Sequence, residues 1–99
     1  NMSDNMVYSQ MKEKAENADP IGGTLKFIVD KSIVHIDGTG GSNVISEEDK
    51  DADCTISTSL EVLLKLKNGE VNPMMAVMGG QIKISGDMGL AMKVQSLLS

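Results

Sequence analysis

Residues 81–93 read QIKISGDMGLAMK, and this stretch sets a strand directly before a helix. Polar and apolar residues alternate from Gln81 to Ser85, which predicts a strand with one buried face. Gly86-Asp87 then provides a turn and a helix cap, and apolar residues recur at helical spacing over residues 88–98. The end of the chain is therefore predicted to be a strand and a helix with apolar faces to bury.

Two further helices are predicted upstream of this stretch. Thr58-Ser59-Leu60-Glu61 has the spacing of a capping box, with Thr58 as the cap, and the apolar helix after it stops at Asn68-Gly69. Asn72-Pro73 opens a short helix over residues 74–78, where every residue is apolar. A helix without a polar side gives no indication of which face is buried.

The first half of the chain is predicted to be a helix followed by strands. An amphipathic helix spans about residues 3–17, and runs rich in β-branched residues predict strands at 24–30, 32–37, 44–45 and 54–57. This order favours a single α+β domain over residues 1–99, with a largely antiparallel sheet and helices on one face.

The composition excludes several classes of protein. One Phe, one Tyr and no Trp leave no stacking platform for single-stranded nucleic acid, and nine lysines without arginine against fourteen acids give a net charge of −5. One cysteine excludes an internal disulfide, which suits a reducing intracellular compartment. No apolar run approaches the ~18 residues of a membrane span. We therefore expect an intracellular, soluble protein that does not bind nucleic acid.

The acid-rich run over residues 47–53 contains the nearest approach to a metal motif. Asp49-x-Asp51-x-Asp53 resembles the start of a calcium loop, but Cys54 stands where the loop needs glycine, and Leu60 stands where it needs glutamate. We expect no metal site and a solvated loop, with a site for a partner as the less favoured alternative.

The two side chains most capable of catalysis have no partners at a recognisable spacing. His35 lies alone in a predicted strand, so we expect an ordinary strand histidine rather than a metal ligand or base. Cys54 follows several acids, which oppose thiolate formation, so a buried structural cysteine is favoured over a nucleophile. These residues predict a protein that is not an enzyme and needs no cofactor.

Methionine is concentrated near the end of the chain. Five of the eight methionines lie between residues 74 and 92. Ordinary core packing is one interpretation of them. The other is a lipophilic cavity between the sheet and Met- and Leu-rich helices, because methionine adapts to ligands of several shapes.

The stretches DADCTIST (51–58) and NGEVNPMMAVMGGQIKISGDMGLAMKVQSLL (68–98) resemble the sterol carrier protein domain, the non-specific lipid-transfer fold. The resemblance implies a five-stranded mixed sheet covered by helices, without catalytic residues. It also implies an apolar tunnel between these layers, which holds fatty acids, acyl-CoA esters, phospholipids or sterols. On this resemblance we expect intracellular lipid binding and transfer, with transient membrane contact. The alternative is a non-binding module that docks on a lipid-metabolising enzyme.

The resemblance also indicates candidate residues for the tunnel wall. The helices over 74–78 and 88–98 are the expected gate, while Leu64, Ile84 and Val94 could equally be plain core. Family members sent to peroxisomes end in a Ser-Lys-Leu-like tripeptide, whereas this chain ends Leu97-Leu98-Ser99, so cytoplasm and peroxisome both stay open. The expected lipid-lining residues are Leu63, Met74, Met75, Val77, Met78, Ile82, Leu90 and Met92.

Overall fold

The computed structural model describes residues 2–98, and Ser99 of the terminal tripeptide lies outside them. The expected order of helices and strands is confirmed, with boundaries that move by one or two residues. The elements are α1 (Met2–Glu16), β1 (Thr24–Val29), β2 (Ser32–Asp37), β3 (Val44–Ser46), β4 (Cys54–Thr58), α2 (Leu60–Lys67), α3 (Pro73–Met78), β5 (Lys83–Gly86) and α4 (Met88–Leu98).

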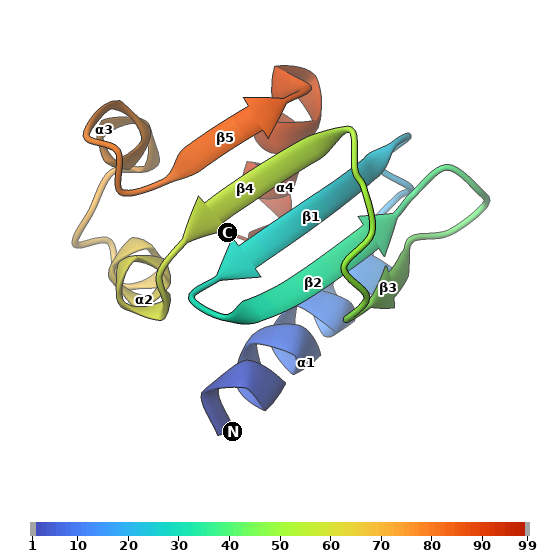
Figure 1. Ribbon diagram of the computed structural model, residues 1–99, viewed down its shortest axis with the longest axis horizontal. Coiled ribbons are helices and arrows are strands. Elements are labelled where there is room, and N and C mark those ends of the chain that lie inside the picture. Colours follow the sequence, from blue (N-terminus) through green and yellow to red (C-terminus); the bar gives the residue numbers. More distant parts are fainter. Residues whose placement is uncertain (1, 99) are drawn as a thin grey trace.

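The strands form one mixed sheet in the order β3-β2-β1-β4-β5 (Figure 1). β1–β2, β2–β3 and β4–β5 pair antiparallel, whereas β1 and β4 pair parallel with Leu25 opposite Cys54. The parallel pair arises because the chain returns along the sheet after β3 before it enters β4. The expected five-stranded mixed sheet is confirmed.

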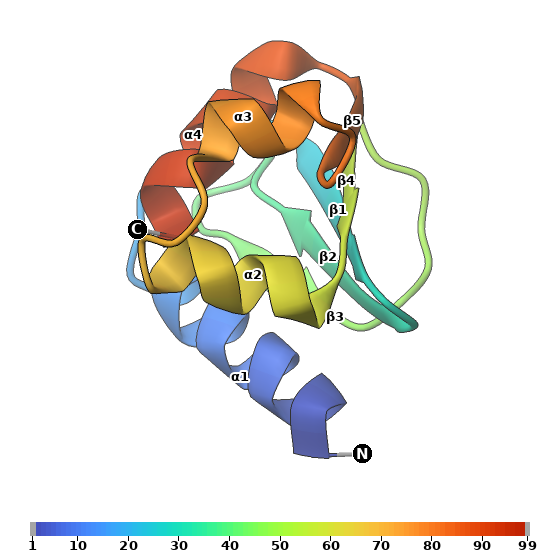
Figure 2. The same cartoon turned by 90° about the vertical axis from the view of Figure 1, so that its left-hand side faces the viewer.

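All the helices cover the same face of this sheet (Figure 2). Leu25, Phe27 and Val29 of β1 are buried on that face, as strand alternation predicts. α1 packs on β2 and β3, and α4 packs on β4 and β5. Among the described residues, no helix is long and apolar enough to cross a membrane.

The junction after α1 is held by one buried amide side chain. Asn43 Nδ2 donates to the carbonyl oxygens of Ala15, at 2.9 Å, and Asp19, at 3.0 Å. Its Oδ1 accepts from the backbone N–H of Ile21 at 2.9 Å. This side chain therefore satisfies three backbone groups where α1 ends and the chain turns into the sheet.

The acid-rich run crosses the opposite face of the sheet as an exposed loop. Asp53 accepts from the Thr24 N–H at 3.0 Å, and the Asp53 N–H donates to Thr24 Oγ1 at 2.9 Å. Lys26 pairs with Asp49 at 2.8 Å. His35 is buried under this loop, with its Nε2 3.1 Å from the Asp51 carbonyl oxygen. These contacts fit the expected solvated loop and the expected ordinary strand histidine.

Most of the predicted helix caps are confirmed, and one is wrong. Asn72 caps α3 and Asp87 caps α4, each through a side-chain oxygen. For α2 the cap is Ser59, whose Oγ accepts from the Val62 N–H at 3.1 Å. Thr58 is still in β4, and its hydroxyl donates to the Gln81 carbonyl oxygen at 3.0 Å. The capping box therefore fails because Thr58 instead ties β4 to the segment before β5.

The strand expected from Gln81 begins at Lys83. It lies at the sheet edge, and the expected alternation is confirmed, because Ile82 is buried and Ile84 half-buried while Gln81, Lys83 and Ser85 are exposed. An edge strand has one neighbour only, and α4 covers it incompletely.

Candidate functional site

A cavity of about 620 Å³ lies between the sheet and the helices. Its floor is a row of side chains across three neighbouring strands, in which Phe27 pairs with Ile56 and Ile56 pairs with Ile84. Helices α2, α3 and α4 supply most of the walls. The remaining lining residues are Lys14, Thr58, Leu63, Leu66, Lys67, Pro73, Val77, Ile82, Ala91, Val94 and Gln95.

The short helix α3 forms one wall of this cavity. Pro73 and Val77, four residues apart, face inward, and Ala76 is fully buried beside them. The Ala76 carbonyl oxygen accepts from the N–H groups of Gln81, at 2.8 Å, and Ile82, at 3.1 Å. One small buried residue and these two bonds therefore help to anchor this wall to the segment that enters β5.

The lining includes four polar side chains, namely Lys14 of α1, Lys67 of α2, Thr58 of β4 and Gln95 of α4. Lys14 from α1 and Lys67 from α2 are the charged residues among those named above. A second, small hollow of about 40 Å³ between α1 and α2 shares Lys14, Leu63 and Lys67 with the large cavity. Lys67 also donates to the side-chain oxygen of Gln10. The two lysines thus stand where the large cavity meets the gap between the helices.

The eight predicted lining residues divide into three sets. Leu63, Val77 and Ile82 line the cavity. Leu90 is buried outside it, with its side chain against Gly23. The other four are methionines that are 67% to 79% exposed and absent from the lining, namely Met74, Met75, Met78 and Met92.

The helical repeat explains why the methionines point away. In α3, Met74 and Met78 are four residues apart on a side of the helix that is turned about 100° from Pro73 and Val77. In α4, Met92 lies next in sequence to Ala91 but on the outer side. The all-apolar sequence of α3 hid this division, because hydrophobic periodicity cannot mark an inner face when every position is apolar.

Several lining residues were missed at the sequence level. Phe27 and Ile56 lie on the helix-covered face of strands that were predicted correctly, so strand alternation could have indicated them. Ile84 and Val94, which could equally have been plain core, also line the cavity, whereas Leu64 is half-exposed.

Cys54 is fully buried at the start of β4 and does not line the cavity. Burial raises the pKa of its thiol, and the nearby carboxylate of Asp87 raises that pKa further. The direction was expected, but burial is the larger cause and the acid is Asp87 rather than the run before Cys54. Within residues 2–98, no group of three His, Cys, Asp or Glu side chains could hold a metal ion.

The sequence matches the SCP-2 sterol transfer family over residues 5–99. It is 36% identical to sterol carrier protein 2 of Rattus norvegicus over 111 aligned residues, which cover 94% of this chain and 19% of the rat protein. The chain thus spans about a fifth of the length of that relative.

Two solved structures share the fold. The sterol carrier protein domain 2 of Helicoverpa armigera has a TM-score of 0.66 and 27% identity, over 96% of this chain and 81% of that chain. Sterol carrier protein 2 of Aedes aegypti, in complex with the C16 fatty acid palmitate, has a TM-score of 0.69 and 16% identity, over 98% of this chain and 94% of that chain. The mixed sheet with helices on one face is therefore an arrangement that these proteins share.

Proposed function

Because this chain belongs to the SCP-2 sterol transfer family, we propose that it binds a lipid in the cavity beneath its helices and transfers it between membranes. The cavity itself carries the proposal. Its volume of about 620 Å³ falls in the usual range of ligand sites, roughly 300–1,000 Å³, and most of its lining side chains are apolar. This lining suits a hydrocarbon chain.

Removal of hydrocarbon from water would drive binding. Each buried CH₂ group contributes about 0.8 kcal/mol, so a sixteen-carbon chain gains on the order of 10 kcal/mol before the costs of ordering the complex. Those costs reduce the net affinity, which leaves binding reversible enough for transfer.

Among lipids, we propose a fatty acid or acyl-CoA ester rather than a neutral sterol as the preferred ligand. Lys14 and Lys67 are the two positive groups of a mostly apolar lining, at the end of the cavity that meets the gap between α1 and α2. A carboxylate or phosphate at that end would gain charge-assisted hydrogen bonds that a sterol hydroxyl cannot match. The palmitate complex of the Aedes aegypti protein is consistent with this preference.

The alternative, a structural module that docks on a lipid-metabolising enzyme, requires a closed interior. The floor row Phe27–Ile56–Ile84 borders a cavity of about 620 Å³, although α4 also packs on β4 and β5. This observation favours the lipid carrier over the module.

The direct test is titration with a fluorescent fatty acid below its micelle concentration, together with native mass spectrometry of the purified chain for bound lipid. We expect saturable binding and co-purified lipid. A clean mass of the chain alone, with no saturable binding of fatty acid, acyl-CoA or sterol, would support the module.

The head-group assignment has its own test in the double variant Lys14→Gln/Lys67→Gln. Loss of two charged donors should weaken fatty-acid binding about tenfold or more and leave a fatty alcohol of equal length nearly unaffected. The matched control is Lys31→Gln/Lys50→Gln, which removes two exposed lysines remote from the lining. Equal losses for acid and alcohol would place the head group elsewhere.

A further inference from the structure

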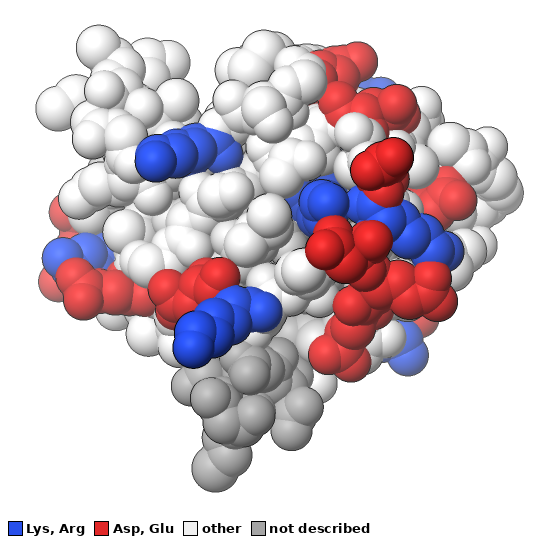
Figure 3. Space-filling model, viewed as in Figure 1, with Lys and Arg blue, Asp and Glu red and all other residues white. Residues whose placement is uncertain are grey.

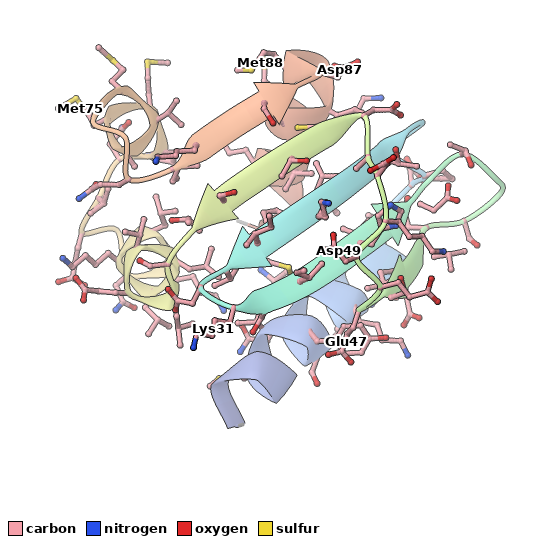
Figure 4. The ribbon with its side chains drawn as sticks, in the orientation of Figure 1. Lys31, Glu47, Asp49, Met75, Asp87 and Met88 are labelled. Carbon is pink, nitrogen blue, oxygen red and sulfur yellow. The ribbon has the colours of Figure 1, made fainter. Side chains whose placement is uncertain are left out.

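Exposed methionines lie on the outer side of two helices that line the cavity. This methionine patch consists of Met74, Met75 and Met78 of α3 with Met88 and Met92 of α4, each more than half exposed. Figure 4 shows Met75 and Met88 pointing away from the sheet, from α3 and from the start of α4. Such a concentration of large apolar side chains on the surface marks a site of interaction.

The patch and the cavity are two sides of the same helices. In α3, Val77 lines the cavity while Met78, the next residue, points outward. In α4, Ala91 lines the cavity while Met92 points outward. A surface that contacts the patch is therefore separated from the cavity only by the thickness of one helix.

The charge of the molecule is distributed unevenly around this patch. Residues 71–99 contain two lysines, Lys83 and Lys93, and one acid, Asp87, whereas residues 1–70 contain thirteen acids and seven lysines. In Figure 3 acidic side chains gather over the loop between β3 and β4, and the surface over α3 carries none. An anionic surface would therefore repel the acidic side and face the patch.

The composition of the patch fits a bilayer better than a protein partner. Protein interfaces rely on Trp, Tyr and Arg as anchors, and the chain has no Trp or Arg. Its single Tyr, Tyr8, lies in α1, away from the patch. Flexible, unbranched methionine side chains can instead enter the fluid boundary between head groups and acyl chains.

We propose that the methionine patch docks on an anionic lipid bilayer and so presents the cavity wall to the membrane. The inference rests on the proposed function, since it assigns the surface through which the lipid enters and leaves. Insertion of the α3 methionines into the bilayer would pull on α3, which is anchored to the rest of the domain through Ala76. Displacement of α3 would open the cavity toward the acyl chains.

The test is co-sedimentation with vesicles of phosphatidylcholine and phosphatidylserine in a two-to-one ratio. The variant Met74→Gln/Met75→Gln/Met78→Gln should bind these vesicles about tenfold or more weakly than the unmodified chain, because vesicle affinity follows the apolar area inserted. The matched control Met6→Gln/Val44→Gln/Leu64→Gln removes three other exposed apolar side chains and should bind normally.

Fatty-acid titration without vesicles separates this inference from the proposed function. The α3 variant should retain its fatty-acid affinity within about twofold, because none of the three side chains lines the cavity. Equal vesicle binding by the α3 variant and the unmodified chain would overturn the docking surface while fatty-acid binding stands. A dimer of the unmodified chain that the α3 variant abolishes would also overturn it, by assigning the patch to a second copy.

Discussion

The two halves of the helical layer pack differently on the same face of the sheet. Over β2 and β3, α1 lies directly on the strands, and its Val7, Met11 and Ala15 are buried. Over β1, β4 and β5, the other helices leave a cavity of about 620 Å³. Both halves use apolar side chains on a strand floor. The comparison indicates that the α1 half is closely packed, while the other half gives up part of its packing and leaves room for the lipid that we propose.

Asn43→Ala should produce the largest effect, because it removes the hydrogen bonds that hold the α1 half together. Three backbone groups, on Ala15, Asp19 and Ile21, would lose their partner, at an expected cost of about 3 kcal/mol. Urea denaturation measures this loss. The control Asn17→Ala removes an exposed bond to the Glu13 carbonyl oxygen and should cost less than about 0.5 kcal/mol. Similar losses of stability in both variants would mean that the hydrogen bonds of Asn43 contribute no more than an exposed bond does.

A matched pair of alanines compares the two halves directly. Ala15 faces the packed half and Ala91 faces the cavity. Ala15→Leu should cost about 2 kcal/mol of stability through overpacking. Ala91→Leu should cost less than about 0.5 kcal/mol, because its side chain can extend into the cavity, and it should weaken fatty-acid binding several-fold instead. Equal stability losses, with ligand affinity unchanged, would mean that the two halves are packed alike.

Neighbouring residues of α3 give a smaller contrast within the cavity half. Val77→Phe should place a ring in the cavity and weaken the binding of bulky sterols more than that of straight acyl chains. Met78→Phe should change neither ligand preference nor stability by more than about 0.5 kcal/mol, because Met78 is exposed. Competition assays with a sterol and a fatty acid measure the ligand preference of both variants, and urea denaturation measures their stability. A selective effect of Met78→Phe would place that side chain in the ligand site after all.

Cys54 should give the smallest effect, which appears only as pH rises. Its folded-state pKa is raised, so the stability that the neutral thiol contributes is fully present below the unfolded pKa of about 8.5. That contribution is lost as pH rises through the higher folded value. Urea denaturation from neutral to alkaline pH should show this decline, and Cys54→Ala should reduce it.

Cys54→Ala should also leave fatty-acid affinity within about threefold, because Cys54 does not line the cavity. Rapid alkylation of Cys54 at neutral pH in the folded chain would contradict its burial and its raised pKa.

Local signals in the sequence were sufficient to predict most helices and strands. Asn72-Pro73 and Gly86-Asp87 cap their helices through side chains only a few residues away, so spacing alone indicated them. The parallel pairing of β1 with β4 joins segments almost thirty residues apart, and the family resemblance indicated only that the sheet is mixed. Pairing between strands so far apart in the sequence depends on how the whole chain packs, which local sequence signals do not report.

The cavity was harder to predict than the fold. Leu63, Val77 and Ile82 were placed in its lining, but the methionines were not distinguishable from them by polarity. Lys14 and Lys67 come from helices more than fifty residues apart and meet only when α1 and α2 pack against each other. Two such lysines form no sequence motif, because they are far apart along the chain and come near each other only in the folded domain.

The parallel pairing of β1 with β4 also sets an order in which the domain can fold. β1 and β2 are joined by a tight turn at Asp30, whose φ is 54°, and a hairpin of this kind closes in roughly 1–10 μs. β4 can join β1 only after a much longer loop has closed, which is slower because more chain entropy is lost first. We expect pulse-labelled hydrogen exchange to protect β1 and β2 amides before those of β4 and β5, and the reverse order would contradict this sequence of events. On a ribosome, α1 and the hairpin would leave the exit tunnel before β4 and β5, so the nascent chain would expose the apolar face of β1 until α2, α3 and α4 arrive to cover it.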